Sequence, residues 1–269
     1  MKILLLSCFL AVCAGGVARA DVWDDTAQND DTSESTVNEL IHGSDQVHDL
    51  AGQAGNTIPD VDWFRLQVPL NTAYEVIVDE FAGGIGGPGS APIVELVQFF
   101  PGGFGLVLAT PVTEFGAARR IARSDAGGSP GETAYFVRVR GATCGVACTS
   151  AARYRIRMVD NTLRLARFNN TNGQSTVLVL QNPTNTTQVA VGYAFGAAGE
   201  PVGTVAIVLA PNAVVATDLS TAAGGQLAGK SGGMQLLSAA PYGTLTGKAV
   251  QLDPATGFVF ETTVEYRRR

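Results

Sequence analysis

Short runs in which apolar and polar side chains alternate occur along most of the chain. DWFRLQV and YEVIVDE are examples from the first half, and TLRLARF and GTVAIVLAP are examples from the second half. A period of two places the apolar side chains on one face of a β-strand. Turns rich in Gly, Pro and Asn separate the runs, which is typical of antiparallel sheets packed face to face. The pattern predicts an all-β protein made of two antiparallel β-sandwich domains in tandem.

The distribution of charge predicts where one domain ends. Residues 21–160 contain 19 acidic and nine basic side chains, whereas residues 161–269 contain five acidic and seven basic ones. Domains of a little over 100 residues are common. We therefore expect one sandwich over 36–160 and another over 161–269, preceded by a polar and flexible lead over 21–35 that is too charged to pack.

The first 20 residues, MKILLLSCFLAVCAGGVARA, have the composition of a secretory signal peptide. One Lys precedes an apolar run that is too short to cross a bilayer, and small residues come after it. This predicts a secreted protein, extracellular or held in a periplasm or at a cell surface. No later run is long and apolar enough to predict a transmembrane helix. The net charge of −6 argues against nucleic-acid binding, which needs a basic surface.

Four segments in the first 160 residues suggest a family. They are the ND pair at Asn29 and Asp30, the run DVDWFRLQVPLNTAYEVIVD, and the two segments AYFVRVRG and YRIRMV, taken as a closing hairpin. Together they resemble the bacterial pre-peptidase C-terminal domain over about residues 28–160. The resemblance implies a jelly-roll-like sandwich of the kind appended to exported proteases. A Gly/Pro-rich insertion, AGGIGGPGSAP, and a tip that carries cysteines depart from the family pattern.

The second predicted domain resembles an immunoglobulin-like or fibronectin-like surface domain. The resemblance rests on the segment LQNPTNTTQVAVGYAFGAAGEPVGTVAIVLAPNAVVATDL. It implies an Ig-like sandwich.

Acidic and amide side chains could form a calcium site in the first domain. Calcium takes six to eight oxygen ligands from carboxylates, amides and backbone carbonyls. Some relatives of the resembled family bind calcium at a comparable place. If the polar lead folds back beside the turn before DWFRLQV, the ligands would be Asn29, Asp30, Asp31, Asp60 and Asp62. The alternative is that these residues only form a turn and a disordered lead.

Two pairs of residues have simpler interpretations. Cys144 and Cys148 lie close enough in sequence to form a disulfide, which an oxidising compartment favours. His42 and His48 lie six residues apart beside two aspartates. A zinc site needs three or four ligands of suitable geometry, so we interpret the two histidines as polar surface.

Arginines alternate with apolar residues in the predicted closing hairpin. If its two strands pair, five guanidinium groups share one outer face: Arg138, Arg140, Arg153, Arg155 and Arg157. Like charges on neighbouring strands need counter-charges, which Glu75 and Asp79 could supply. The pattern favours a salt-bridged solvent face, and the alternative is a docking face for an acidic glycan or protein partner.

Several glycine-rich stretches match catalytic or nucleotide-binding motifs by pattern alone. GGQLAGKS fits a phosphate loop, and the overlapping GKSGG fits the serine-hydrolase elbow. Both motifs need a helix directly after them, but the next residues are GGMQLLSAAPYG, which open on two glycines and soon reach a proline. GIGGPG and GGSPG fail in the same way. We interpret all four as loops.

The sequence contains no coherent trio of nucleophile, base and orienting residue. It therefore predicts a non-enzymatic secreted protein that binds an extracellular polysaccharide or protein surface and needs no cofactor apart from the calcium above. The alternative is an accessory component that acts beside an exported enzyme such as a protease.

Overall fold

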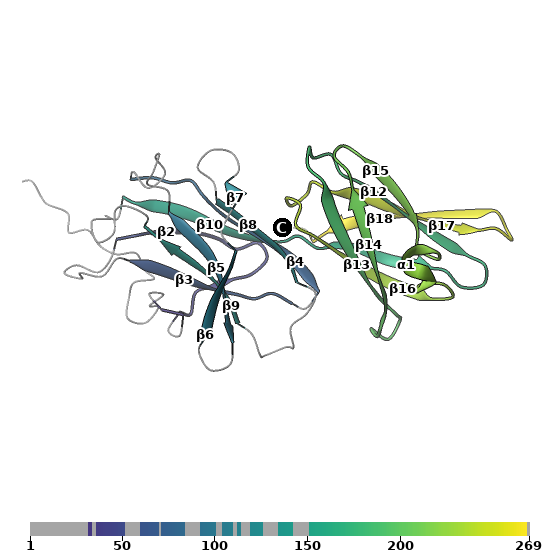
Figure 1. Cartoon of the computed structure of the whole chain (residues 1–269), viewed down its shortest axis with the longest axis horizontal. Helices are drawn as coiled ribbons and strands as arrows, with labels where there is room; N and C mark the ends of the chain where they lie inside the picture. Colours follow the sequence, from purple (N-terminus) through teal and green to yellow (C-terminus); the bar gives the residue numbers. More distant parts are fainter. Residues whose placement is uncertain are drawn as a thin grey trace, which may run out of the picture.

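A computed structural model shows a chain built almost entirely of β-strands, which confirms the all-β prediction (Figure 1). The structure describes residues 32–33, 36–51, 60–69, 71–83, 92–100, 104–109, 112–113, 119–125, 134–141 and 151–267. Within these ranges, no helix is long and apolar enough to cross a membrane.

The first module, which ends at Asp160, is a sandwich of two five-stranded sheets. One sheet has the order β1 (Glu39–Leu40), β3 (Val61–Leu66), β9 (Ala134–Arg140), β5 (Ile93–Phe100) and β6 (Phe104–Ala109). The other has the order β2 (Asp45–Asp49), β10 (Arg153–Asp160), β4 (Thr72–Asp79), β8 (Arg119–Asp125) and β7 (Val112–Thr113). All pairs are antiparallel except β1 with β3, which run parallel.

Alternation along the strands builds the core of the first module. Every second side chain of β3 and β4 points between the sheets, as the period of two predicts. Phe64, Tyr74, Val76 and Val78 are almost completely buried there, with partners from β5, β9 and β10.

The second module begins with β11 and consists of one continuous eight-stranded sheet. Its strand order is β14 (Pro201–Leu209), β13 (Gln188–Phe195), β16 (Ser231–Ser238), β11 (Leu163–Asn169), β18 (Phe258–Tyr266), β17 (Thr246–Asp253), β12 (Ser175–Gln181) and β15 (Val214–Asp218). The sheet folds over a single core, so that the end strands β14 and β15 come close together (Figure 1). Its two layers form a second sandwich.

A two-residue connection joins the modules, and both residues are buried. The Asn161 N–H donates to the carbonyl oxygen of Ala73 at 2.7 Å, and the Asn161 side chain donates to the carbonyl oxygen of Ala240. The Thr162 hydroxyl oxygen accepts from the Ala73 N–H at 2.9 Å. Asn161 therefore contacts backbone of both modules.

The predicted closing hairpin does not exist. β9 pairs with β3 and β5 in one sheet, whereas β10 pairs with β2 and β4 in the other. Alternation identifies a strand but not its partner, because pairing depends on contacts between distant parts of the chain. Both segments are strands as predicted, but they lie in opposite layers of the sandwich.

The stretch that matches a phosphate loop leads into a strand. The short helix α1 (Ala222–Gly225) is broken by non-helical backbone angles at Ala223 and Gly224. β16 then begins at Ser231, where a phosphate loop or a nucleophile elbow would need a helix. The stretch is therefore a connection between strands β15 and β16. GIGGPG and GGSPG lie outside the described residues.

Candidate binding groove on the second module

The arginines of β9 are neutralised on the outer face of their sheet. Arg138 donates to the Glu95 carboxylate at 2.6 Å, and Arg140 approaches the same carboxylate at 3.5 Å. The Arg138 guanidinium also lies 5.1 Å from the centre of the Trp63 ring, within the range of a cation–π contact. These charges are therefore engaged within the module.

The arginines of β10 lie on the other sheet and have their own carboxylates. Arg155 donates to Asp45 at 2.5 Å and to Glu80 at 2.6 Å, and these hydrogen bonds raise its pKa above the ordinary value. Arg157 donates to Asp79, and Arg153 stands opposite Asp49 in the register of β10 with β2. The five arginines lie on two sheets, so the prediction that they share one face is wrong. The predicted salt bridges exist for Arg138, Arg155 and Arg157, and Asp79 is one of the two predicted counter-charges.

The two acidic residues of the predicted calcium site that the structure describes are buried around the start of β3. Asp60 is 4% exposed and Asp62 is 2% exposed. The Asp62 carboxylate accepts a hydrogen bond from the Tyr154 hydroxyl of β10, which links the two sheets through the interior. The described residues contain no group of three or more His, Cys, Asp or Glu side chains arranged to hold a metal.

Other predicted site residues lie outside the described ranges. Asn29, Asp30 and Asp31 are among them, so calcium binding stays a prediction. Cys144 and Cys148 also lie outside, and their disulfide stays a prediction too. The same holds for the signal peptide over 1–20.

His48 is buried, so its interpretation as polar surface is wrong, whereas His42 is half-buried. His48 is 1% exposed, and its ring lies edge-on to Phe64 with 4.8 Å between the ring centres. His42 lies at the joint between the modules, where its Nδ1 accepts from the Asp160 N–H at 2.8 Å. Its ring centre is 6.5 Å from that of Tyr242 in the second module. Each imidazole is therefore held by structural contacts.

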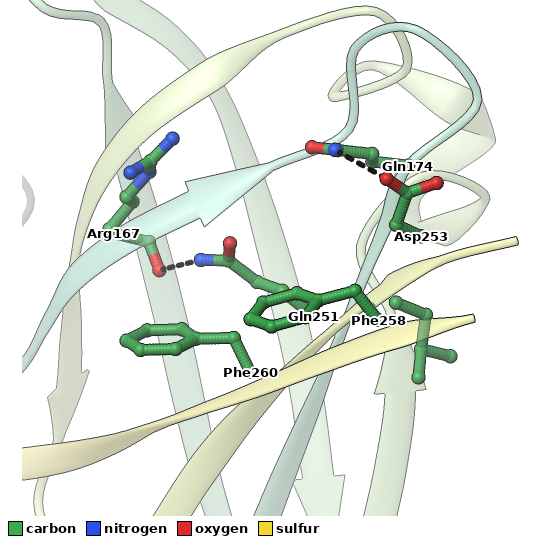
Figure 2. Close-up of a pocket in the computed structure, with 7 residues that line it drawn as sticks. Arg167, Gln174, Gln251, Asp253, Phe258 and Phe260 are labelled. Carbon is green, nitrogen blue, oxygen red and sulfur yellow. Dashed lines mark hydrogen bonds between the residues drawn. The ribbon is translucent and has the colours of Figure 1, made fainter. Parts of the chain in front are cut away.

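We call the distal half of the β17–β18 hairpin, residues 251–260, the arm. A groove lies in the second module between strand β11 and the arm (Figure 2). Its cavity volume is about 250 Å³. Gln251 pairs with Phe260 and Asp253 with Phe258 in the strand register, so these four side chains share one face of the arm. Residues that line the groove are Arg167, Gln174, Gln251, Leu252, Asp253, Phe258 and Phe260.

Hydrogen bonds hold the walls of this groove together. The Gln251 amide donates to the carbonyl oxygen of Arg167 at 3.4 Å, and the Gln174 amide donates to the Asp253 carboxylate at 3.3 Å. Figure 2 shows that the Arg167 guanidinium points away from the two phenylalanine rings, while its carbonyl faces Gln251. The polar atoms next to the rings are therefore amide, carbonyl and carboxylate oxygens.

The turn at the end of the arm is closed by Asp253. Its carboxylate accepts from the Ala255 N–H at 3.0 Å, and its carbonyl accepts from the Gly257 N–H at 2.8 Å. Gly257 has a φ of +70°, which an L-residue with a side chain rarely adopts. A hydrogen bond from the Thr256 side chain, with others from Gln174 and the Ala255 backbone, lowers the pKa of Asp253. This wall of the groove is therefore anionic at neutral pH.

Two aromatic side chains that line this groove are unusually exposed to solvent. Phe258 is 63% exposed and Phe260 is 48% exposed, and Val259 between them is 54% exposed. Contiguous exposed apolar side chains mark interaction sites in soluble proteins. The groove therefore offers two aromatic rings beside hydrogen-bond acceptors, an arrangement suited to binding rather than to acid–base or nucleophilic chemistry.

Sequence reasoning missed this groove, because it treated GFVFETTVEY only as one more strand of the second module. A signal was present in the segment. FVF is a run of three apolar residues directly after a turn, whereas a strand with one buried face alternates.

Comparisons with known proteins leave the family open. No family model and no curated protein matches the chain. The two resemblances described for the modules therefore stay predictions.

The similar solved structures are remote. They include a calcium-binding mutant of Bacteroides uniformis beta-glucuronidase 2, with 10% identity and a TM-score of 0.20 over 76% of this chain and 26% of that one. A glycosyl hydrolase family 2 member from Bacteroides cellulosilyticus has 12% identity and a TM-score of 0.23 over 81% and 31%. The extracellular region of zebrafish Gpr126/Adgrg6 has 9% identity and a TM-score of 0.22 over 84% and 31%. The chain thus spans less than a third of each of these structures.

Proposed function

We propose that this chain is a secreted, non-catalytic binding protein that recognises an extracellular polymer through the groove beside the arm. The observation that carries the proposal is the pair Phe258 and Phe260, which project side by side from one face of β18 and remain about half exposed or more. Leaving two such rings in water forgoes hydrophobic stabilisation on the order of 1 kcal/mol each. A ligand that covers them recovers it.

The shape of the site supports a long ligand rather than a small one. The two rings are two residues apart on an extended strand, which separates them by roughly 7 Å along the strand. The groove is open, and the acceptor oxygens of Gln251 and Asp253 lie along the same face of the arm. A chain molecule can contact both rings and both polar groups at once.

The first module contributes differently. Arg138, Arg155 and Arg157 are paired with carboxylates, so these three side chains offer little attraction to an acidic ligand. We therefore assign binding to the second module, and not to the arginine face that the alternation of β9 and β10 suggested.

Co-sedimentation tests this proposal. The purified chain is mixed with insoluble peptidoglycan, chitin, cellulose or collagen, each with calcium and with EDTA. We expect retention on at least one polymer, and the double substitution Phe258→Ala with Phe260→Ala should weaken it by about tenfold or more, because both contacts are removed.

The matched control removes two exposed apolar side chains elsewhere in the same module. Val189 and Val208 are 48% and 63% exposed and stand opposite each other on β13 and β14. Val189→Ala with Val208→Ala should leave retention unchanged. Equal weakening by both double substitutions, or no retention on any polymer, would contradict the proposal. Loss of retention in EDTA alone would support the predicted calcium site.

A further inference from the structure

Strand β18 has an open edge beside the groove. On one side of the strand, Val264, Glu265 and Tyr266 pair with β11. On the other side, Val264 pairs with β17. From Phe258 to Thr263, β17 is its one partner among the described strands. Alternate residues of this stretch direct their backbone N–H and C=O groups to the vacant side.

A bulge in β11 creates this opening. Leu165 pairs with Met234 of β16, but the next pair is Phe168 with Gly232, so the register shifts between Leu165 and Phe168. β11 continues with β16 and no longer pairs with β18. The turn after β11 is held by a hydrogen bond from the Asn169 N–H to the Thr176 hydroxyl at 2.8 Å. The continuation of β11 therefore forms no strand pair with β18, and it contacts the arm through the hydrogen bond from the Gln251 side chain to the Arg167 carbonyl.

Soluble proteins usually protect a strand edge with a proline, a lysine or an inward-pointing charge. The stretch 258–263, FVFETT, contains no proline and no lysine. Its one charged side chain, Glu261, is ion-paired with Lys248 at 2.7 Å. The three residues at its start are the exposed Phe258, Val259 and Phe260. The edge therefore combines unpaired backbone groups with exposed apolar side chains.

We propose that the polymer bound at this site is a polypeptide, an extended segment of a partner protein that adds to β18 as a further strand. This inference rests on the proposed function and specifies its ligand. Backbone N–H and C=O groups that alternate at strand spacing are complementary to another extended backbone. Sugar hydroxyls do not repeat this alternation.

The site also predicts the partner's side chains. Side chains of adjacent strands that face the same way contact each other, with a period of two along each strand. Phe258 and Phe260 would therefore lie beside alternate apolar side chains of the bound segment. The Asp253 carboxylate, at the turn end of the arm, favours a hydrogen-bond donor or a basic group on the partner there.

The position of the arm leaves room for the partner. The β17–β18 hairpin projects from the end of the second module that is farther from the first module (Figure 1). A partner segment can approach the open edge without meeting the first module. A second copy of this chain fits less well, because six open residues on each copy would bury far less surface than the ~1,200 Å² or more of a stable interface.

Peptide selection and then backbone methylation test the inference. Random displayed peptides of about twelve residues, long enough to cover the edge at roughly 3.4 Å a residue, are selected against the full chain. The best binder is synthesised unmodified and in two N-methylated forms, one with even and one with odd residues methylated. Strand addition requires that one form loses affinity by about tenfold or more while the other stays within about threefold, since alternate N–H groups face β18.

The protein variants provide the second readout. Phe258→Ala with Phe260→Ala should weaken the unmodified peptide, and Val189→Ala with Val208→Ala should not. Selection of no peptide, or equal effects of the two methylated forms, would overturn the inference. If the chain is retained on a polysaccharide in a way that depends on Phe258 and Phe260, and binds no peptide, the inference of a polypeptide ligand is overturned and the proposed function stands. A concentration-dependent dimer in sedimentation velocity that is abolished by the Phe258 and Phe260 substitutions would also overturn the inference, because the strand added to β18 would then come from a second copy of this chain.

Discussion

Asp62 shows how packing changes the role of a single side chain. It belongs to a sequence pattern that suits calcium, yet its carboxylate lies between the sheets of the first module and accepts from the Tyr154 hydroxyl. Tyr154 itself is completely buried. Burying a carboxylate costs free energy of desolvation, and the hydrogen bond from Tyr154 offsets part of this cost. Without the donor, the cost remains and the offset is lost. The hydrogen bond therefore links β3 to β10 in addition to the apolar core.

Tyr154→Phe removes that donor and keeps the ring. We expect the free energy of unfolding to fall by about 1–3 kcal/mol, measured by urea denaturation. Tyr193→Phe is the control, because the Tyr193 hydroxyl makes no hydrogen bond within the described residues; its effect should stay within about 0.5 kcal/mol. Equal effects of the two substitutions would mean that the Tyr154–Asp62 hydrogen bond contributes nothing.

At the scale of the element, β16 depends on glycines at its start. Gly232 stands opposite Phe168 of β11, and its neighbour Gly233 stands opposite Phe195 of β13. A Cβ atom on Gly232 would overlap the carbonyl oxygen of Phe195. Gly232 follows Ser231 directly, where both motifs would need a helix, and its lack of a side chain allows β16 to approach β13 closely.

Gly232→Ala forces the backbone of β16 or β13 to move. Such overpacking costs about 1–3 kcal/mol, and we expect a loss of this size in the urea unfolding of the second module. Ser231→Ala, one residue earlier and exposed, should change the free energy of unfolding by less than about 0.5 kcal/mol. An unchanged Gly232→Ala midpoint would show that this close approach is not required.

At the scale of the whole molecule, Glu75 couples the modules. It points outward from the first sandwich, as the alternation of β4 predicts, but it is only 3% exposed because the β16–β17 loop covers it. Its carboxylate accepts from the Tyr242 N–H at 2.8 Å. Nearby, burial raises the pKa of Tyr266 to about 12, and the charge of Glu75 adds to this shift. The joint is thus a packed polar interface.

Glu75→Ala leaves the Tyr242 N–H without its acceptor in this interface. We expect a loss of about 1–3 kcal/mol in the stability of the joined modules, seen in calorimetry as a lower or a split transition. Glu75→Gln keeps an acceptor oxygen and should lose less. Glu265→Ala, an exposed carboxylate on β18, is the control. A calorimetric profile unaffected by Glu75→Ala would mean that this contact does not couple the modules.

The sequence by itself determined that this protein is all-β, because period-two alternation is a local property of each segment and the turn residues between segments are local too. It identified both β9 and β10 as strands, and it placed the alternating apolar side chains of DWFRLQV and YEVIVDE on one face of each strand. The outward direction of Glu75 came from the same alternation.

Only the tertiary structure decided which strands pair and which side chains are covered. β9 and β10 lie in opposite sheets, His48 and Asp62 are buried, and Phe258 and Phe260 project into water. Each of these outcomes depends on residues far away in the chain. The groove beside the arm is the clearest case. A bulge in β11 keeps that strand with β16 and leaves open an edge of β18, and β11 and β18 come from opposite ends of the second module's sequence.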